Sequence, residues 1–79
     1  MNNIKVRYFA IFRELAGCDQ EVIATEAASV AELFKIVAER HGLPQLRDAK
    51  VAVNDEMRGF DTVLEDGDSV LFFPPVSGG

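Results

Sequence analysis

One strongly patterned helix constrains this chain more than any other feature of its sequence. Between about Ser29 and His41, apolar positions recur at helical spacing and form a single stripe made of Val30, Leu33, Phe34, Val37 and His41. Ser29 and Glu32 have the spacing of a capping box at the helix start, and Gly42 is placed to end the helix in the left-handed conformation. Because the stripe needs an apolar cover, the rest of the chain must supply one.

The other apolar segments have the pattern of strands. Ile4–Tyr8 alternates with period two, and Gln20–Thr25, Lys50–Asn54 and Ser69–Phe73 have strand-like composition. Between the first two, Phe12–Gly17 has the spacing of one or two helical turns. Strands on both sides of one amphipathic helix predict an α+β fold in which a mixed, four- to five-stranded sheet packs on that helix. This is the ubiquitin-like β-grasp architecture.

Composition and charge exclude several classes of function. The chain has 79 residues, the size of one domain, and its single cysteine excludes internal disulfides, zinc fingers and iron–sulfur clusters. Thirteen acidic residues against eight basic ones give a net charge of −5, which opposes binding to nucleic acid or to an anionic membrane. The sequence has neither a signal-peptide pattern nor a membrane-spanning run, so we expect a cytoplasmic protein.

Two residues that could carry chemistry are expected to be passive. Cys18 has no basic neighbour in the sequence, and Asp19 beside it opposes the thiolate form. His41 cannot hold a metal alone, and we expect it to interact with the last carbonyls of its own helix.

The C-terminal residues carry the functional signal. They are Pro74, Pro75, Val76, Ser77, Gly78 and Gly79. Prolines cannot continue a sheet and favour a stiff, extended stalk, and glycines lack the side chains that a narrow channel would exclude. We therefore predict a β-grasp domain over residues 1–75 and a protruding tail over residues 76–79 that inserts into a partner.

A terminal carboxylate reacts only after activation. Attack of the Gly79 carboxylate on the α-phosphate of ATP would give an acyl-adenylate, from which a sulfur nucleophile such as a persulfide could displace AMP and leave a thiocarboxylate. The chain contains no Walker motif and no G-x-G-x-x-G motif. We therefore expect that this chain binds no cofactor and no metal, and that a separate activating protein uses the ATP.

The chain resembles a known family over nearly its whole length, and three segments carry the resemblance. Residues 66–79, with their Phe-Phe-Pro-Pro-Val-Ser-Gly-Gly ending, and residues 4–10 and 12–17 are similar to small subunits of molybdopterin synthase (MoaD family). The resemblance implies a sulfur carrier that an E1-like enzyme (MoeB type) adenylates and that a sulfur donor, such as a persulfide protein, converts to the thiocarboxylate at Gly79. It also implies a large subunit (MoaE type) that receives the tail and passes sulfur to cyclic pyranopterin monophosphate, forming the molybdopterin dithiolene. Such a chain is not catalytic alone.

Strand parity predicts the surface that a partner contacts. Alternate residues of the first and last strands face the helix, which turns Phe9, Leu71 and Phe73 to the opposite face. These strands are neighbours in a β-grasp sheet, so Phe9 and Phe73 should lie close together as a docking patch beside the stalk. The alternative is a second small core covered by loops. The predicted interface comprises Phe9, Met57, Phe60, Leu71, Phe73, Pro74 and Pro75.

Three other functions use the same pattern. One is a sulfur carrier of the thiazole pathway (ThiS-like), which shares the fold, the tail and the adenylation chemistry. A second is a ubiquitin-like modifier that forms an isopeptide bond between Gly79 and a lysine, which mass spectrometry distinguishes from a thiocarboxylate. A third is a docking module whose Gly-Gly ending has no chemical role.

Overall fold

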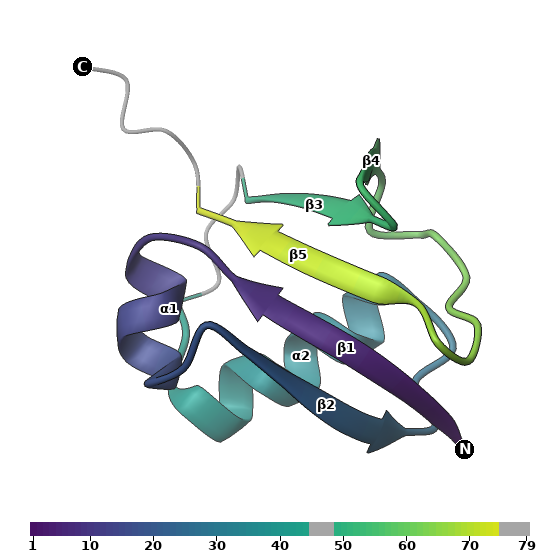
Figure 1. Ribbon diagram of the computed structural model, residues 1–79, viewed down its shortest axis with the longest axis horizontal. Coiled ribbons are helices and arrows are strands. Elements are labelled where there is room, and N and C mark those ends of the chain that lie inside the picture. The colour runs from purple at the N-terminus through teal and green to yellow at the C-terminus, as the bar shows by residue number, and fades with distance from the viewer. Residues whose placement is uncertain (45–48, 75–79) are drawn as a thin grey trace.

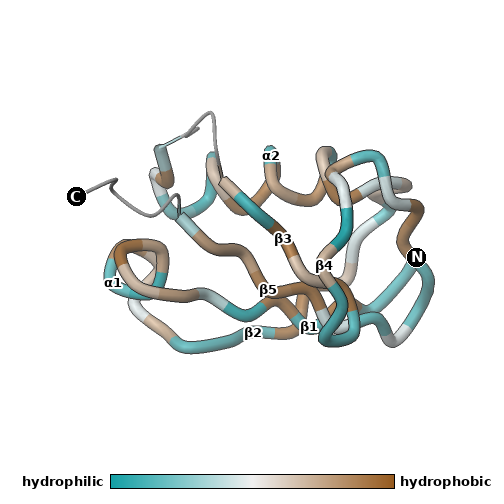
Figure 2. Tube along the Cα trace, turned by 90° about the horizontal axis from the view of Figure 1, so that it is seen from above, coloured by the Kyte–Doolittle hydropathy of each residue, from teal (hydrophilic) through white to brown (hydrophobic). Residues whose placement is uncertain are grey.

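The computed structural model describes residues 1–44 and 49–74, and the described residues form one sheet and two helices (Figure 1). In chain order the elements are β1 (Asn2–Tyr8), α1 (Ile11–Ala16), β2 (Gln20–Thr25), α2 (Val30–His41), β3 (Lys50–Val53), β4 (Glu56–Arg58) and β5 (Ser69–Phe73). The sheet has the order β2-β1-β5-β3-β4; β1 and β5 are parallel and the other neighbouring pairs are antiparallel. With α2 lying across one face, this confirms the predicted β-grasp fold (Figure 2).

Local interactions at its two ends explain why α2 forms where the sequence predicts it. At the start, the Ser29 Oγ accepts from the Glu32 amide at 3.3 Å, and the Glu32 Oε2 accepts from the Ser29 amide at 3.2 Å. At the end, Gly42 adopts a φ of 68° and its amide donates to the Ala38 carbonyl. The capping box and the glycine thus satisfy amides and a carbonyl that the helix leaves unpaired.

The core lies between α2 and the face of the sheet that we call the inner face. Along β1 and β5 the burial alternates as the sequence predicts, with Val70 and Phe72 fully buried and their neighbours half-exposed. The largest side chains that are completely buried are Phe12, Phe72, Ile4, Leu33, Val6, Val30, Val37, Val51 and Val70. Burial of apolar surface on this one face therefore holds the helix to the sheet.

The structure adds one strand, β4, that the sequence analysis did not predict. Asn54 and Asp55 both have positive φ, 51° and 69°, and connect β3 to β4 in a two-residue hairpin. Asparagine and aspartate tolerate this conformation better than most residues. All three β4 residues are exposed, so this short edge strand leaves no hydrophobic alternation in the sequence by which it could be recognised.

A carboxylate on β2 ties the sheet to the end of α2. The Glu21 Oε2 accepts from the Tyr8 hydroxyl at 2.6 Å and lies 2.5 Å from His41 Nε2, while Arg40 approaches Oε1 at 3.5 Å. The expectation that His41 interacts with carbonyls of its own helix is therefore wrong. Its ring contacts the Tyr8 ring edge-on, at a centroid distance of 5.6 Å, because β1 and β2 bring a tyrosine and a carboxylate beneath the last turn of α2.

Glu21 links the stability of the fold to pH. Burial raises the pKa of this carboxyl, but hydrogen bonds from Tyr8 and His41 and the nearby positive charges outweigh burial and hold the pKa below its usual value of 4.5. Burial and the hydrogen bond to Glu21 raise the pKa of Tyr8 well above its usual range, so its hydroxyl remains a donor. A lowered folded-state pKa stabilises the protein at neutral pH, and this stabilisation is lost as the pH falls through that pKa.

We predict that Glu21→Gln lowers the free energy of unfolding by about 2 kcal/mol at pH 7, because hydrogen bonds to a charged group are weakened. The difference from the wild type should narrow as the pH falls below 4.5 and then through the lowered pKa of Glu21 in the folded protein, where its carboxylate becomes protonated. Urea unfolding over this pH range measures both effects, with Glu39→Gln on the exposed side of α2 as the control. If Glu21→Gln lowered the free energy of unfolding by the same amount at every pH, the ionised Glu21 carboxylate would not be the stabilising group.

Candidate functional site: the outer face of the sheet and the start of the tail

The second face of the sheet, which we call the outer face, is the side away from α2. The registers of the four strand pairs agree on which residues of the five strands lie on this face. They are Asn3, Lys5, Arg7, Gln20, Val22, Ala24, Lys50, Ala52, Met57, Ser69, Leu71 and Phe73. Of these residues only Ala52 is buried, and it is not part of the core cluster.

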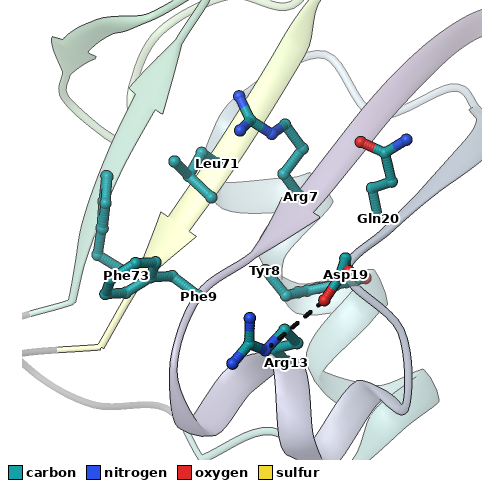
Figure 3. Close-up of a pocket in the computed structure, with 8 residues that line it drawn as sticks. All are labelled: Arg7, Tyr8, Phe9, Arg13, Asp19, Gln20, Leu71 and Phe73. Atoms are coloured by element: carbon teal, nitrogen blue, oxygen red, sulfur yellow. Dashed lines mark ion pairs between the residues drawn. The ribbon is translucent and has the colours of Figure 1, made fainter.

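An aromatic pair lies at one end of the outer face. The rings of Phe9 and Phe73 are 5.6 Å apart between centroids and are tilted by 59°, which confirms that the two residues are close together. Phe9 keeps 55% of its surface exposed. With Leu71 they border a concavity into which side chains of β1, α1 and β5 point (Figure 3). A second small core covered by loops is therefore not what the described residues form.

Pro74, the first residue of the predicted stalk, follows this pair at the end of the sheet because β1 and β5 are parallel. The carboxyl ends of β1 and β5 meet at the same edge of the sheet (Figure 1), so the residue after β1, Phe9, is next to the last residue of β5, Phe73 (Figure 3). Pro74 follows Phe73 and is half-buried. The other predicted tail and stalk residues lie outside the described part of the chain: Pro75, Val76, Ser77, Gly78 and Gly79.

The structure separates the two remaining predicted interface residues. Met57 is 61% exposed and lies on the outer face opposite Ala52, but β3 separates it from Leu71. Phe60 does not reach the outer face. It packs against the core on the helix side, where its ring lies 5.8 Å from that of Phe34 and 6.4 Å from that of Phe72. The segment that contains Phe60 has no strand periodicity, so the sequence could not indicate its side.

Ala10 positions Phe9, and the sequence analysis did not identify it. It has a φ of 54° and a ψ of −127°, a conformation that favours glycine, and it is the N-cap of α1 without a side-chain hydrogen bond. Its carbonyl accepts from the amides of Arg13 and Glu14. The chain thus turns sharply between β1 and α1, which leaves Phe9 outside the core while Phe12 is completely buried.

Cys18 is partly buried and packs against the core. Burial, followed by the charges of Glu21 and Asp19, raises the pKa of the Cys18 thiol. The reactive thiolate is therefore disfavoured, as the sequence predicts.

Within residues 1–44 and 49–74, no three histidine, cysteine or acidic side chains gather in a way that could hold a metal ion. In the same ranges no helix is long and apolar enough to cross a membrane. The aromatic pair, with Phe9 exposed and Phe73 half-buried, is the kind of apolar surface feature that marks interaction sites in other proteins.

Comparison with known proteins relates this geometry to a family. Residues 6–79 match the model of the ThiS family. The chain is 44% identical to the molybdopterin synthase sulfur carrier subunit of Escherichia coli, with 96% of this chain and 99% of the relative covered. It is 36% identical to the protein of that name from Mycobacterium tuberculosis, over the full length of both.

Solved structures share the fold of this chain. A putative molybdopterin converting factor subunit 1 from Pyrococcus furiosus is 38% identical, with a TM-score of 0.79 over 96% of this chain and all of that one. A complex of subunits 1 and 2 of the molybdopterin-converting factor from Helicobacter pylori contains a chain that is 33% identical, with a TM-score of 0.67 and coverage of 98% and 99%. SAMP1 from Haloferax volcanii, at 22% identity and a TM-score of 0.82 over 99% of this chain and all of that one, shares the fold.

We predict that Ala10→Gly raises the free energy of unfolding by about 1 kcal/mol, because relief of about 1–3 kcal/mol of backbone strain exceeds the added entropy of the unfolded chain. The matched control is Ala24→Gly, an exposed position in β2 with ordinary strand conformation, which should lose about 0.5–1 kcal/mol. Thermal unfolding of both variants measures the contrast. A loss of stability in Ala10→Gly equal to that of the control would show that Ala10 is unstrained.

Proposed function

This chain belongs to the ThiS family, and from that membership we propose that it is the sulfur carrier subunit of a molybdopterin synthase. The observation that carries the proposal is the aromatic pair of Phe9 and Phe73, which lies where the segment ending in Gly78 and Gly79 leaves the sheet. A carrier needs a surface for its partners and a chain end that can react. The outer face is a candidate for that surface, and the sequence ends in the Gly78-Gly79 pair on which the proposed chemistry depends.

The proposed reaction takes place at the carboxylate of Gly79. A carboxylate oxygen attacks the α-phosphate of ATP, pyrophosphate leaves, and an acyl-adenylate forms. The terminal sulfur of a persulfide then attacks the carbonyl carbon and AMP leaves. A thiol attacks the donor's own sulfur in the resulting acyl disulfide, a disulfide forms between that thiol and the donor, and the thiocarboxylate remains on Gly79. Transfer of this sulfur to cyclic pyranopterin monophosphate builds one half of the dithiolene, so the carrier must be recharged for the second half.

The partners follow from what this chain cannot do by itself. An E1-like enzyme binds and uses ATP, a persulfide protein supplies sulfur, and the large subunit holds the pterin while this chain presents the tail. This chain binds no cofactor in that scheme and works in the cytoplasm. The Helicobacter pylori complex of subunits 1 and 2 supports a large-subunit partner for a protein of this kind.

A thiazole-pathway carrier or a protein modifier is the second candidate function. The name of the ThiS family supports the thiazole-pathway carrier. SAMP1, which is called a small archaeal modifier protein, has the same fold as this chain. Both alternatives also begin with adenylation at Gly79, so activation alone does not separate them. The acceptor does, because it is a pterin, a thiazole precursor or a lysine side chain.

We predict that the intact mass of the chain changes by the exchange of one oxygen for one sulfur after incubation with ATP, an E1-like enzyme and a persulfide donor. Deletion of Gly79, or addition of one residue after it, should abolish the exchange because the reacting carboxylate is displaced. The folded domain should be unaffected, which circular dichroism would verify.

The acceptor decides between the candidate functions. The charged carrier should convert cyclic pyranopterin monophosphate to molybdopterin when the large subunit is added. Charging without this conversion, together with transfer to a thiazole precursor or the appearance of lysine conjugates, would replace the proposal by one of its alternatives. Sulfur loading of the variant extended beyond Gly79 would contradict the chemistry at that carboxylate.

We predict that Phe73→Ala weakens binding to the large subunit roughly thirtyfold, since truncation of a central interface aromatic costs about 2 kcal/mol. The melting temperature should change little because Phe73 lies on the outer face. Val63→Ala is the matched control, since Val63 is 71% exposed and apolar but is not an outer-face residue. Unchanged affinity together with a large loss of stability would place Phe73 in the core and remove it from the interface.

A further inference from the structure

The outer face has a charge opposite in sign to that of the whole chain. Three of its residues are basic, Lys5, Arg7 and Lys50, and no acidic residue takes an outward position in the five described strands. The two acidic residues that these strands contain, Glu21 and Glu56, have inward positions in the register. The rest of the chain therefore holds 13 acidic residues against five basic ones.

Basic groups border the aromatic pair directly. Lys50 is the cross-strand partner of Phe73, and Arg7 is the cross-strand partner of Leu71. Arg13 reaches the same concavity from α1 (Figure 3). Positive side chains thus approach the concavity and its aromatic border from β1, β3 and α1.

Two of these basic groups have exposed carboxylates as partners, and one of these carboxylates, that of Asp19, also lines the concavity. Arg7 pairs with Asp55 at 3.7 Å and Arg13 with Asp19 at 3.6 Å, and the side chains of these aspartates are 91% and 81% exposed. Exposed ion pairs of this kind contribute about 0–1 kcal/mol. A carboxylate on a partner can therefore take the place of either aspartate at little cost.

We infer that the outer face binds a protein surface on which an apolar pocket for the aromatic pair is bordered by carboxylates. The inference rests on the proposed function, in which this partner is the large subunit. An acidic border attracts the outer face although the net charge of −5 repels an acidic protein at long range. Salt screens charges beyond about 8–10 Å, so the charges of the facing surfaces govern the final approach.

The test compares two double variants with the same change in net charge. Arg7→Gln with Lys50→Gln removes two positive charges from the outer face. Lys35→Gln with Arg58→Gln removes two from elsewhere, since Lys35 lies on α2 and Arg58 has an inward position opposite Val51. Stopped-flow association with the large subunit is measured at low and at physiological ionic strength.

The outer-face double variant should associate about tenfold more slowly at low salt and should lose most of its salt dependence. The control double variant should stay within about twofold of the wild type, and melting temperatures verify that both are folded. If the double variant is not folded, Arg7→Gln and Lys50→Gln are measured separately. Each should change the logarithm of the association rate constant by about half as much as the double variant.

Two results would overturn the inference while leaving the proposed function intact. Equal slowing of both double variants would show that net charge, and not the outer face, controls association. Unchanged or faster association of the outer-face variant would show that the partner surface is neutral or basic. A wild-type chain that does not bind the large subunit at all would overturn the proposed function, and this inference with it.

Discussion

The parallel pairing of β1 with β5 is the constraint on which the rest of this structure depends. It brings the carboxyl ends of both strands to one edge, and so it places Phe9 beside Phe73, the residue that precedes Pro74. An antiparallel pairing would put these residues at opposite edges of the sheet. The turn before β5 holds this arrangement, because the Gly67 amide donates to the Asn3 carbonyl and the Lys5 amide donates to the Asp68 carbonyl.

The two faces of the sheet have separate roles. The inner face carries the apolar burial that stabilises the domain, and Glu21 adds a polar connection to Tyr8 and to His41 at the end of α2. The outer face contributes little to this core and retains aromatic and basic side chains that are partly or largely exposed. Substitutions on the outer face can therefore change partner binding without unfolding the domain, which suits a subunit whose function is to be recognised.

A carrier that is loaded with sulfur, donates it and is loaded again has to dissociate from each partner as readily as it binds. Aromatic side chains in a pocket mainly set how slowly a complex dissociates, whereas charges around it mainly set how fast it forms. The outer face combines a single aromatic pair with surrounding basic groups. In the proposed cycle, fast association with modest affinity allows successive exchange between the activating enzyme and the large subunit.

The sequence by itself determined α2, the main strands, the fold class and the closeness of Phe9 to Phe73, because these depend on periodicity, caps and strand parity. Only the tertiary structure decided that Phe60 packs inward, that His41 binds Glu21 and that a short β4 forms. Each of these depends on contacts between distant segments that leave no local pattern. The basic outer face has the same origin, since strand register decides which charged residues lie together.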